Sequence, residues 1–184
     1  RVLLVLEDPT HDQFIAKPVV ERLLSDLGKP NAKVQHMTEP HLGGIAQVFD
    51  EARWERILAQ YRGWDLFVVV VDRDGVDERE ARARDWIGKL RQKSGVSVWS
   101  LAIEEIEVWA MAPYGPQLDA RWAEVRREVN PKERFFRPLV AQLGFTGPGG
   151  GRKALMREAM RSFAAMKRKC PEINRLSLDL EAAL

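Results

Sequence analysis

The stretch FVVVVDRDGVD, from Phe67 to Asp77, passes from an uninterrupted apolar run into closely spaced carboxylates. A short apolar run that ends in charged residues is typical of a strand buried on both faces of a parallel sheet. Side chains at the carboxyl ends of such strands face the crevice in which ligands bind. Residues two apart on an extended chain point to the same side, so Asp72 and Asp74 are predicted to converge there if the extended conformation continues past Val71.

Strands and helices alternate along the first part of the chain. Apolar runs predict strands at Val2–Leu6, Val34–Met37, Leu66–Val71 and Val96–Leu101. Apolar residues at helical spacing predict helices at Asp12–Leu27, Glu51–Tyr61 and Glu78–Gln92. This alternation predicts an α/β fold, with a parallel sheet flanked by helices.

The second part of the chain has a helical pattern. Helices are predicted at Glu104–Met111, Leu118–Glu128, Lys132–Leu143 and Arg152–Lys169, with proline and glycine between them. Gly147–Gly151 lacks the spacing of a phosphate-binding loop and is predicted to be a mobile linker. We expect one domain over residues 1–184, made of an α/β core at 1–111 and a helical C-terminal part at 112–184.

Composition indicates the class of protein. The hydrophobic share of 45% is that of a folded globular chain rather than a disordered one. The apolar runs are too short to span a bilayer, and no secretion leader is evident, so we expect a cytoplasmic protein. Cys170 is the single cysteine, which excludes an internal disulfide. The net charge of +2 means that any affinity for nucleic acid must come from a local patch.

Carboxylates as close as Asp72 and Asp74 repel each other unless a proton or a cation lies between them. Mg²⁺ is suitable because it takes oxygen ligands and keeps several waters. A solvated turn that only ends the strand is the equally supported alternative. Glu7 ends the first strand, and neighbouring strands lie about 5 Å apart. If the two strands are neighbours, Glu7 is therefore predicted to face the two aspartates across one metal site.

A glutamate after the first strand and DxD after a later one resembles the Toprim domain of topoisomerases, primases and overcoming-lysogenization-defect nucleases. The likeness extends to small stand-alone Toprim-like bacterial proteins encoded beside an ATPase. It is carried over nearly the whole chain by EDPTHDQFIAKPVVERLL, VVVVDRDG, LAIEEIEVWAMA, NPKERF and CPEINRLSLDL. The chain departs from the Toprim opening at Asp8, where glycine is usual, and at His11, where an acid is usual; Asp12 follows one residue later.

The resemblance implies metal-dependent hydrolysis of phosphodiester bonds in DNA or RNA. It implies a nuclease that works with an ATPase subunit in genome maintenance or anti-phage defence, and it leaves homo-oligomer formation open. The implied ligands of Mg²⁺ or Mn²⁺ are Glu7, Asp72, Asp74 and Glu107. Glu7 is either a direct ligand or the general base. His11 is a further candidate ligand, suited to the softer Mn²⁺.

Basic residues supply the remaining candidates. Lys132, in the NPK segment, is the candidate catalytic cation, and Lys153 is an alternative to it. Helical spacing over Arg152–Lys169 predicts an apolar stripe opposite a basic one. The apolar stripe contains Met156, Ala159, Phe163, Met166 and Cys170, and the basic stripe contains Lys153, Arg157, Arg161 and Arg168. The basic stripe predicts either a nucleic-acid contact or an ordinary solvated face.

Glu104 and Glu107 are predicted to share one face of a helix near the metal, and Glu105 to be solvated. Two other functions stay open. A non-catalytic Toprim-like regulatory or scaffolding subunit is favoured by the departures at Asp8 and His11. A phosphoacceptor of the response-regulator kind would need an acidic pair after the first strand, and the DxD motif argues against it.

Overall fold

The computed structural model describes residues 1–94, 97–102 and 104–184. Within these residues, four parallel strands form one sheet in the order β2-β1-β3-β4. The strands are β1 (Val2–Leu6), β2 (Val34–His36), β3 (Leu66–Asp72) and β4 (Ser97–Ala102). The predicted α/β architecture with a parallel sheet is confirmed. The predicted start of the last strand at Val96 lies outside the described residues.

The two strands that carry the candidate acids are neighbours. In the β1–β3 pair, Leu4 is opposite Val68 and Leu6 is opposite Val70. Every residue of β1 and all but the last of β3 are buried. The carboxyl ends of the two strands therefore lie side by side at one edge of the sheet.

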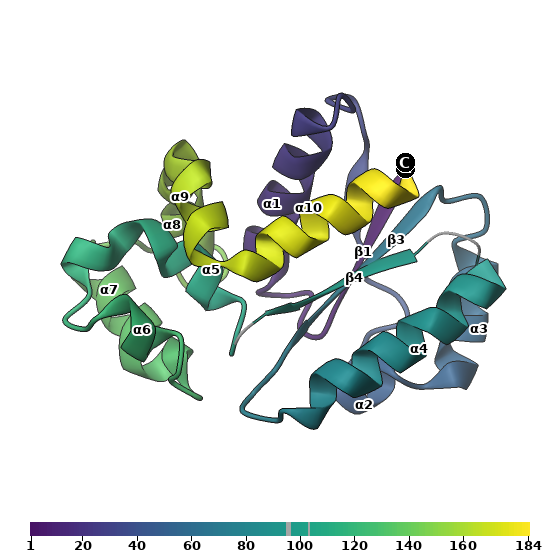
Figure 1. Ribbon diagram of the computed structural model, residues 1–184, viewed down its shortest axis with the longest axis horizontal. Coiled ribbons are helices and arrows are strands. Elements are labelled where there is room, and N and C mark those ends of the chain that lie inside the picture. Colours follow the sequence, from purple (N-terminus) through teal and green to yellow (C-terminus); the bar gives the residue numbers. More distant parts are fainter. Residues whose placement is uncertain (95–96, 103) are drawn as a thin grey trace.

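Helices cover both faces of the sheet (Figure 1). On one face lie α1 (Gln13–Asp26) and α10 (Pro171–Ala183). The other face is covered by α3 (Glu51–Gln60), α4 (Glu78–Ser94) and the single turn α2 (Ile45–Val48). Side chains alternate along each strand, so each strand contributes to both apolar layers.

The two apolar layers follow this alternation. Leu4 and Val68 belong to the core under α1 and α10, whereas Leu3 and Val69 belong to the core that contains Trp54. Strands buried on both faces consist almost entirely of apolar residues, which explains the unbroken run in β3.

Short helices lie beyond the carboxyl ends of the strands (Figure 1). They are α5 (Glu107–Met111), α6 (Trp122–Val125), α7 (Arg137–Gln142), α8 (Arg152–Ala159) and α9 (Phe163–Lys169). Non-α turns join several of them, at Ala112–Gln117, Lys132–Phe136 and Met160–Ser162.

Two of the predicted helices are much shorter in the structure. The helix expected from Leu118 to Glu128 reduces to the four residues of α6. The helix expected from Glu104 begins only at Glu107, because the backbone carbonyl of Glu104 accepts hydrogen bonds from the turn after β3. The amphipathic segment Arg152–Lys169 is helical throughout but divided by its 3₁₀ turn.

Helix α10 was not predicted from its sequence. It begins at Pro171, buries Ile173, Leu176 and Leu180, and packs beside β4 and α1. Its buried residues belong to the same apolar core as Val68 of the sheet. The helical part of the chain therefore shares a core with the α/β part. Among the described residues, no helix is both long and apolar enough to cross a bilayer.

Within the glycine-rich segment Gly147–Gly151, for which a mobile linker was predicted, Gly149 and Gly151 approach other parts of the chain closely. Gly149 has φ +69°, and a Cβ there would lie 2.4 Å from a ring carbon of Phe14. Gly151 has φ +86°, and a Cβ there would lie 2.5 Å from the Val140 side chain. Only glycine meets both requirements, namely left-handed backbone and close approach. The segment fixes the start of α8 against α1 and α7.

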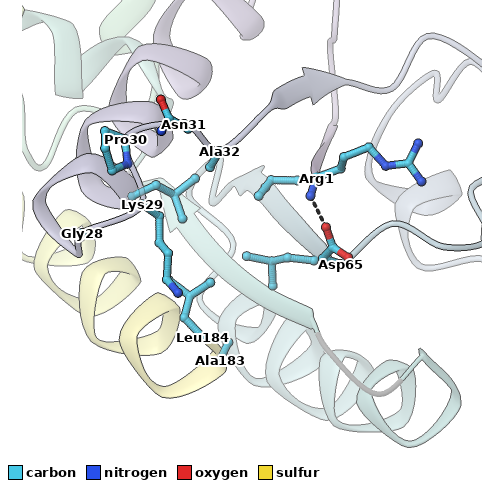
Figure 2. Close-up of a pocket in the computed structure, with 12 residues that line it drawn as sticks. Arg1, Gly28, Lys29, Pro30, Asn31, Ala32, Asp65, Ala183 and Leu184 are labelled. Atoms are coloured by element: carbon cyan, nitrogen blue, oxygen red, sulfur yellow. Dashed lines mark hydrogen bonds and ion pairs between the residues drawn. The ribbon is translucent and has the colours of Figure 1, made fainter.

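A cavity of about 470 Å³ lies at the amino ends of the strands (Figure 2). Arg1, Lys29, Asp65 and Leu184 are among its lining residues, and the amino group of Arg1 pairs with Asp65. The candidate acids lie at the opposite edge of the sheet, so this cavity is separate from them.

Candidate metal centre

The pleat of the sheet places the two strand-end acids on different faces. Val70 belongs to the core under α1 and α10, so Asp72, two residues later, points to that face. Val5 belongs to the opposite core, so Glu7 points toward α2 and α3. The charge of Glu7 nevertheless acts on the carboxyl group of Asp72.

Asp72 is the centre of the acidic group. Its Oδ1 accepts a hydrogen bond from the Ile106 backbone N–H at 2.9 Å. Burial raises the pKa of Asp72 well above its usual value, and neighbouring carboxylates raise it further. In decreasing order of effect, these neighbours are Asp12, Glu107, Asp74 and Glu7. Four acids, from three segments of the chain, therefore lie near enough to Asp72 to raise its pKa.

Asp12 belongs to the acidic group, although the sequence did not predict it as a site residue. It lies at the start of α1, is only 8% exposed, and accepts a hydrogen bond from the Asp8 N–H at 3.2 Å. Burial, followed by the charge of Glu107, raises the pKa of Asp12 to about 7. The sequence held a signal for it, since Asp12 comes five residues after Glu7, at the predicted start of the helix that follows the first strand.

His11 is turned away from this group. Its Nδ1 lies 2.8 Å from Oδ2 of Asp8, and both side chains are exposed. Although burial acts in the opposite direction, the contacts with His11 lower the pKa of Asp8. Asp8 and His11 thus pair with each other in the turn between β1 and α1. Asp12, not His11, is therefore the residue of this turn that joins the acidic group around Asp72.

Asp74 does not continue the strand, and the prediction that it shares a side with Asp72 by extended geometry is wrong. It has φ +48°, in the left-handed region, because the chain turns sharply after β3. Its side chain, 43% exposed, pairs with Arg79 at 2.6 Å. Asp74 still lies close enough to raise the pKa values of Asp72 and Glu7.

Glu7 has one carboxylate oxygen engaged and one without a partner. Its Oε1 accepts from the Ile45 N–H at 3.1 Å, whereas Oε2 is buried and unpaired. Burial raises the pKa of Glu7, and the charge of Asp74 adds to the effect. A buried polar atom without a partner is costly, so this oxygen is a natural place for a proton or a cation.

Glu107 is buried beside Arg152. Arg152 Nε donates to Glu107 Oε1 at 3.0 Å, and Nη2 donates to the same oxygen. The guanidinium also donates to the Gly149 carbonyl at 2.8 Å and lies over the Phe136 ring. The sequence contained no signal for this pair, because its members are 45 residues apart.

Glu104 and Glu105 do not behave as predicted. Glu104 precedes the helix and does not share a face with Glu107; it binds Arg73 instead. Glu105 is buried, not solvated, and its oxygens accept from the N–H of Lys132 at 2.8 Å and from its Nζ at 3.3 Å. Although burial alone would lower it, the carboxylates of Glu105 and Glu107 raise the pKa of Lys132. Lys132 is thus a charged neighbour of the acidic group.

The two predicted stripes of α8 and α9 are present. The apolar residues Met156, Ala159, Phe163, Met166 and Cys170 are all buried. The basic residues Lys153, Arg157, Arg161 and Arg168 are all exposed. Arg157 and Arg161 both pair with Glu158, so part of the basic charge is neutralised locally.

The donor atoms at this edge of the sheet are carboxylate oxygens, which suit Mg²⁺ or Mn²⁺. Among residues 1–94, 97–102 and 104–184, no three His, Cys, Asp or Glu side chains are arranged as a ready-made metal cage. Mg²⁺ usually binds through only one or two carboxylates, with waters and substrate phosphates as its other ligands. The unpaired oxygen of Glu7 and the crowding around Asp72 fit such an open site.

Comparisons of this chain with models of protein families, with curated proteins and with solved structures find no match. Its function is therefore inferred from the geometry and chemistry of the acidic group.

Proposed function

We propose that this chain is a nuclease subunit of the Toprim kind, which hydrolyses phosphodiester bonds of DNA or RNA with Mg²⁺ or Mn²⁺ and works with an ATPase. The supporting observation is the half-buried carboxylate of Asp72, which ends one of two adjacent parallel strands and has other acids around it. Acids crowded in this way disfavour joint ionisation, and a divalent cation removes the conflict.

The residues have distinct roles in this proposal. A bound divalent ion would activate a water and neutralise charge that develops on the phosphate. Asp72 would hold the ion, since its carboxyl group is fixed by the Ile106 N–H. Glu7 accepts the proton of the attacking water, because its buried Oε2 is free and its pKa is raised. Lys132 supplies positive charge beside the acids.

The distribution of charge favours a nucleic-acid substrate. Residues 112–169 contain thirteen Lys or Arg and five Asp or Glu, a net charge of +8. The other residues, 1–111 and 170–184, contain sixteen Lys or Arg and twenty-two Asp or Glu, a net charge of −6. The small overall charge therefore hides a basic segment, residues 112–169, in a chain whose other residues are on balance acidic. A basic surface next to a metal site is what phosphate-backbone binding requires.

The direct test of the proposal is a cleavage assay with purified protein, Mg²⁺ or Mn²⁺, several nucleic-acid forms and the candidate ATPase. We expect cleavage that depends on the divalent ion and is removed by EDTA. Cleavage that persists in EDTA would contradict a metal-dependent mechanism.

Replacing Lys153 and Arg157 together by Ala is expected to weaken DNA binding while leaving the acidic group intact. Both side chains are exposed on α8, so the change removes phosphate contacts without removing core. The slope of log K against log salt should become shallower by about 1 to 2, since each lost phosphate contact contributes about 0.9. Fluorescence anisotropy at several salt concentrations measures both quantities.

The matched control is the pair Arg84→Ala and Lys89→Ala on α4. These residues are similarly exposed. Each forms an ion pair with an acid one turn earlier in the helix, Arg84 with Glu80 and Lys89 with Asp85. The control should leave DNA affinity nearly unchanged. Equal losses in the two double variants would show that only total charge matters and that α8 is no specific contact surface.

A second candidate, a non-catalytic Toprim-like subunit, is favoured by the internal arginines. Arg152 already compensates Glu107, and Arg79 already compensates Asp74, so part of the acidic charge is neutralised without metal. The two candidates differ in one result. A wild-type protein that binds its ATPase partner but cleaves no nucleic acid with it would establish the second candidate.

A further inference from the structure

We propose that Glu104 is a positioning residue that holds the turn after β3, and with it the carboxylates of Asp72 and Asp74, in the arrangement that binds the cation. This inference rests on the proposed function. It assigns to Glu104 a role different from the predicted place on a helix face shared with Glu107.

The Glu104 side chain binds the turn directly. It is only 2% exposed, and its Oε2 accepts from the Gly75 backbone N–H at 2.8 Å and from Arg73 Nε at 2.9 Å. Arg73 Nη2 donates to the other oxygen, Oε1. Two donors of the guanidinium fork and one backbone donor therefore occupy the carboxylate. Because both carboxylate oxygens of Glu104 bind donors of the turn, this residue stabilises the turn and is not a metal ligand.

The backbone around Glu104 binds the same turn. Its carbonyl accepts from the N–H groups of Arg73 at 2.9 Å and of Asp74 at 3.1 Å. Two residues later, the Ile106 N–H donates to Asp72 Oδ1 at 2.9 Å. Segment 104–106 thus holds the backbone of one acid and the side chain of the other.

The turn needs such a restraint for two reasons. Asp74 has φ +48°, a left-handed conformation that aspartate tolerates better than most residues but that still costs energy, so contacts from outside the turn help to keep it. The carboxylates of Asp72 and Asp74 also repel each other and would separate if they were free to move. A separated pair would bind a divalent ion more weakly.

Glu104→Gln tests the inference, since it keeps the shape but removes the charge that holds Arg73. Mn²⁺ alone is the probe, titrated while the electron paramagnetic resonance signal of the free ion is followed. We expect Mn²⁺ affinity to fall by about 10- to 100-fold, the usual cost of losing a residue that orients ligands. Amide hydrogen exchange at Asp74 and Gly75, measured without metal, should become faster.

Glu172→Gln is the matched control. Glu172 is another largely buried glutamate held by an arginine, Arg126, but it lies on α10 and does not contact the turn. Its loss should lower stability while leaving Mn²⁺ affinity unchanged. Should Glu104→Gln fail to fold, Arg73→Gln removes the same fork from the more exposed partner and should also weaken Mn²⁺ binding.

The outcomes separate the two proposals. Wild-type Mn²⁺ affinity in folded Glu104→Gln, or in Arg73→Gln, overturns the positioning role and leaves the proposed function standing. A wild-type protein that binds no Mn²⁺ overturns the proposed function, and the positioning role with it. Weaker binding in Glu104→Gln, with the control unchanged, supports both.

Discussion

Asp72→Asn is expected to lower divalent-ion-dependent cleavage by about a thousandfold, which corresponds to about 4 kcal/mol of transition-state stabilisation. The Asn carbonyl can still accept from the Ile106 N–H, so the shape of the site is kept. What is lost is the negative charge at the centre of the acidic group. Single-turnover cleavage in Mg²⁺, compared with the wild type at equal concentration, measures the effect.

The same substitution should not destabilise the fold. The pKa of Asp72 is raised, so its ionised form is disfavoured in the folded protein, and a neutral amide relieves that penalty. Asp119→Asn is the control, because Asp119 is exposed and is not one of the acids that act on Asp72. It should leave both cleavage and stability near the wild-type values. Full cleavage by Asp72→Asn would place the observed activity in another site or another protein.

Without metal, the stability of the protein is expected to fall as the pH rises from about 4 to 8, with Asp12 as a main cause. The pKa of Asp12 rises from 3.8 to about 7 on folding. Between these values the folded state binds more protons than the unfolded state, so the free energy of unfolding decreases with rising pH. This is the reverse of the usual behaviour of a salt-bridged aspartate. The full effect is about 4 kcal/mol, reached above the pKa of the folded state.

Asp12→Asn isolates this contribution. The amide keeps an acceptor for the Asp8 N–H but cannot ionise, so the variant should gain stability relative to the wild type as the pH rises. Urea unfolding in EDTA across pH 4 to 8 measures the difference between the two curves. Asp26→Asn, near the exposed end of the same helix, is the control and should follow the wild type. Parallel curves for wild type and Asp12→Asn would show that Asp12 ionises normally.

Much of the fold follows from local patterns in the sequence. The apolar run of β3 and the helical spacing in α1 and α3 predict those elements to within one or two residues. Their alternation predicts the parallel sheet, because parallel neighbours need a crossover helix between them. The strand-end positions of Glu7 and Asp72 follow in turn, since both acids come directly after predicted strands. The two stripes of α8 and α9 were also predictable, because helical spacing is a property of neighbouring residues.

The arrangement of the acids depended on tertiary structure. Asp12 entered the group and His11 did not, although they are adjacent, because the first turn of α1 buries only one of them. Asp74 left the strand because the turn after β3 is held by Glu104, which lies about thirty residues further along the chain.

Arg152 pairs with Glu107 because glycines with left-handed backbone bring the start of α8 close to α5. Local spacing encodes periodicity and burial, whereas these contacts depend on distant segments meeting with a particular backbone conformation. The sequence therefore determined which strands end in acids, and only the tertiary structure decided which acids meet and which arginines neutralise them.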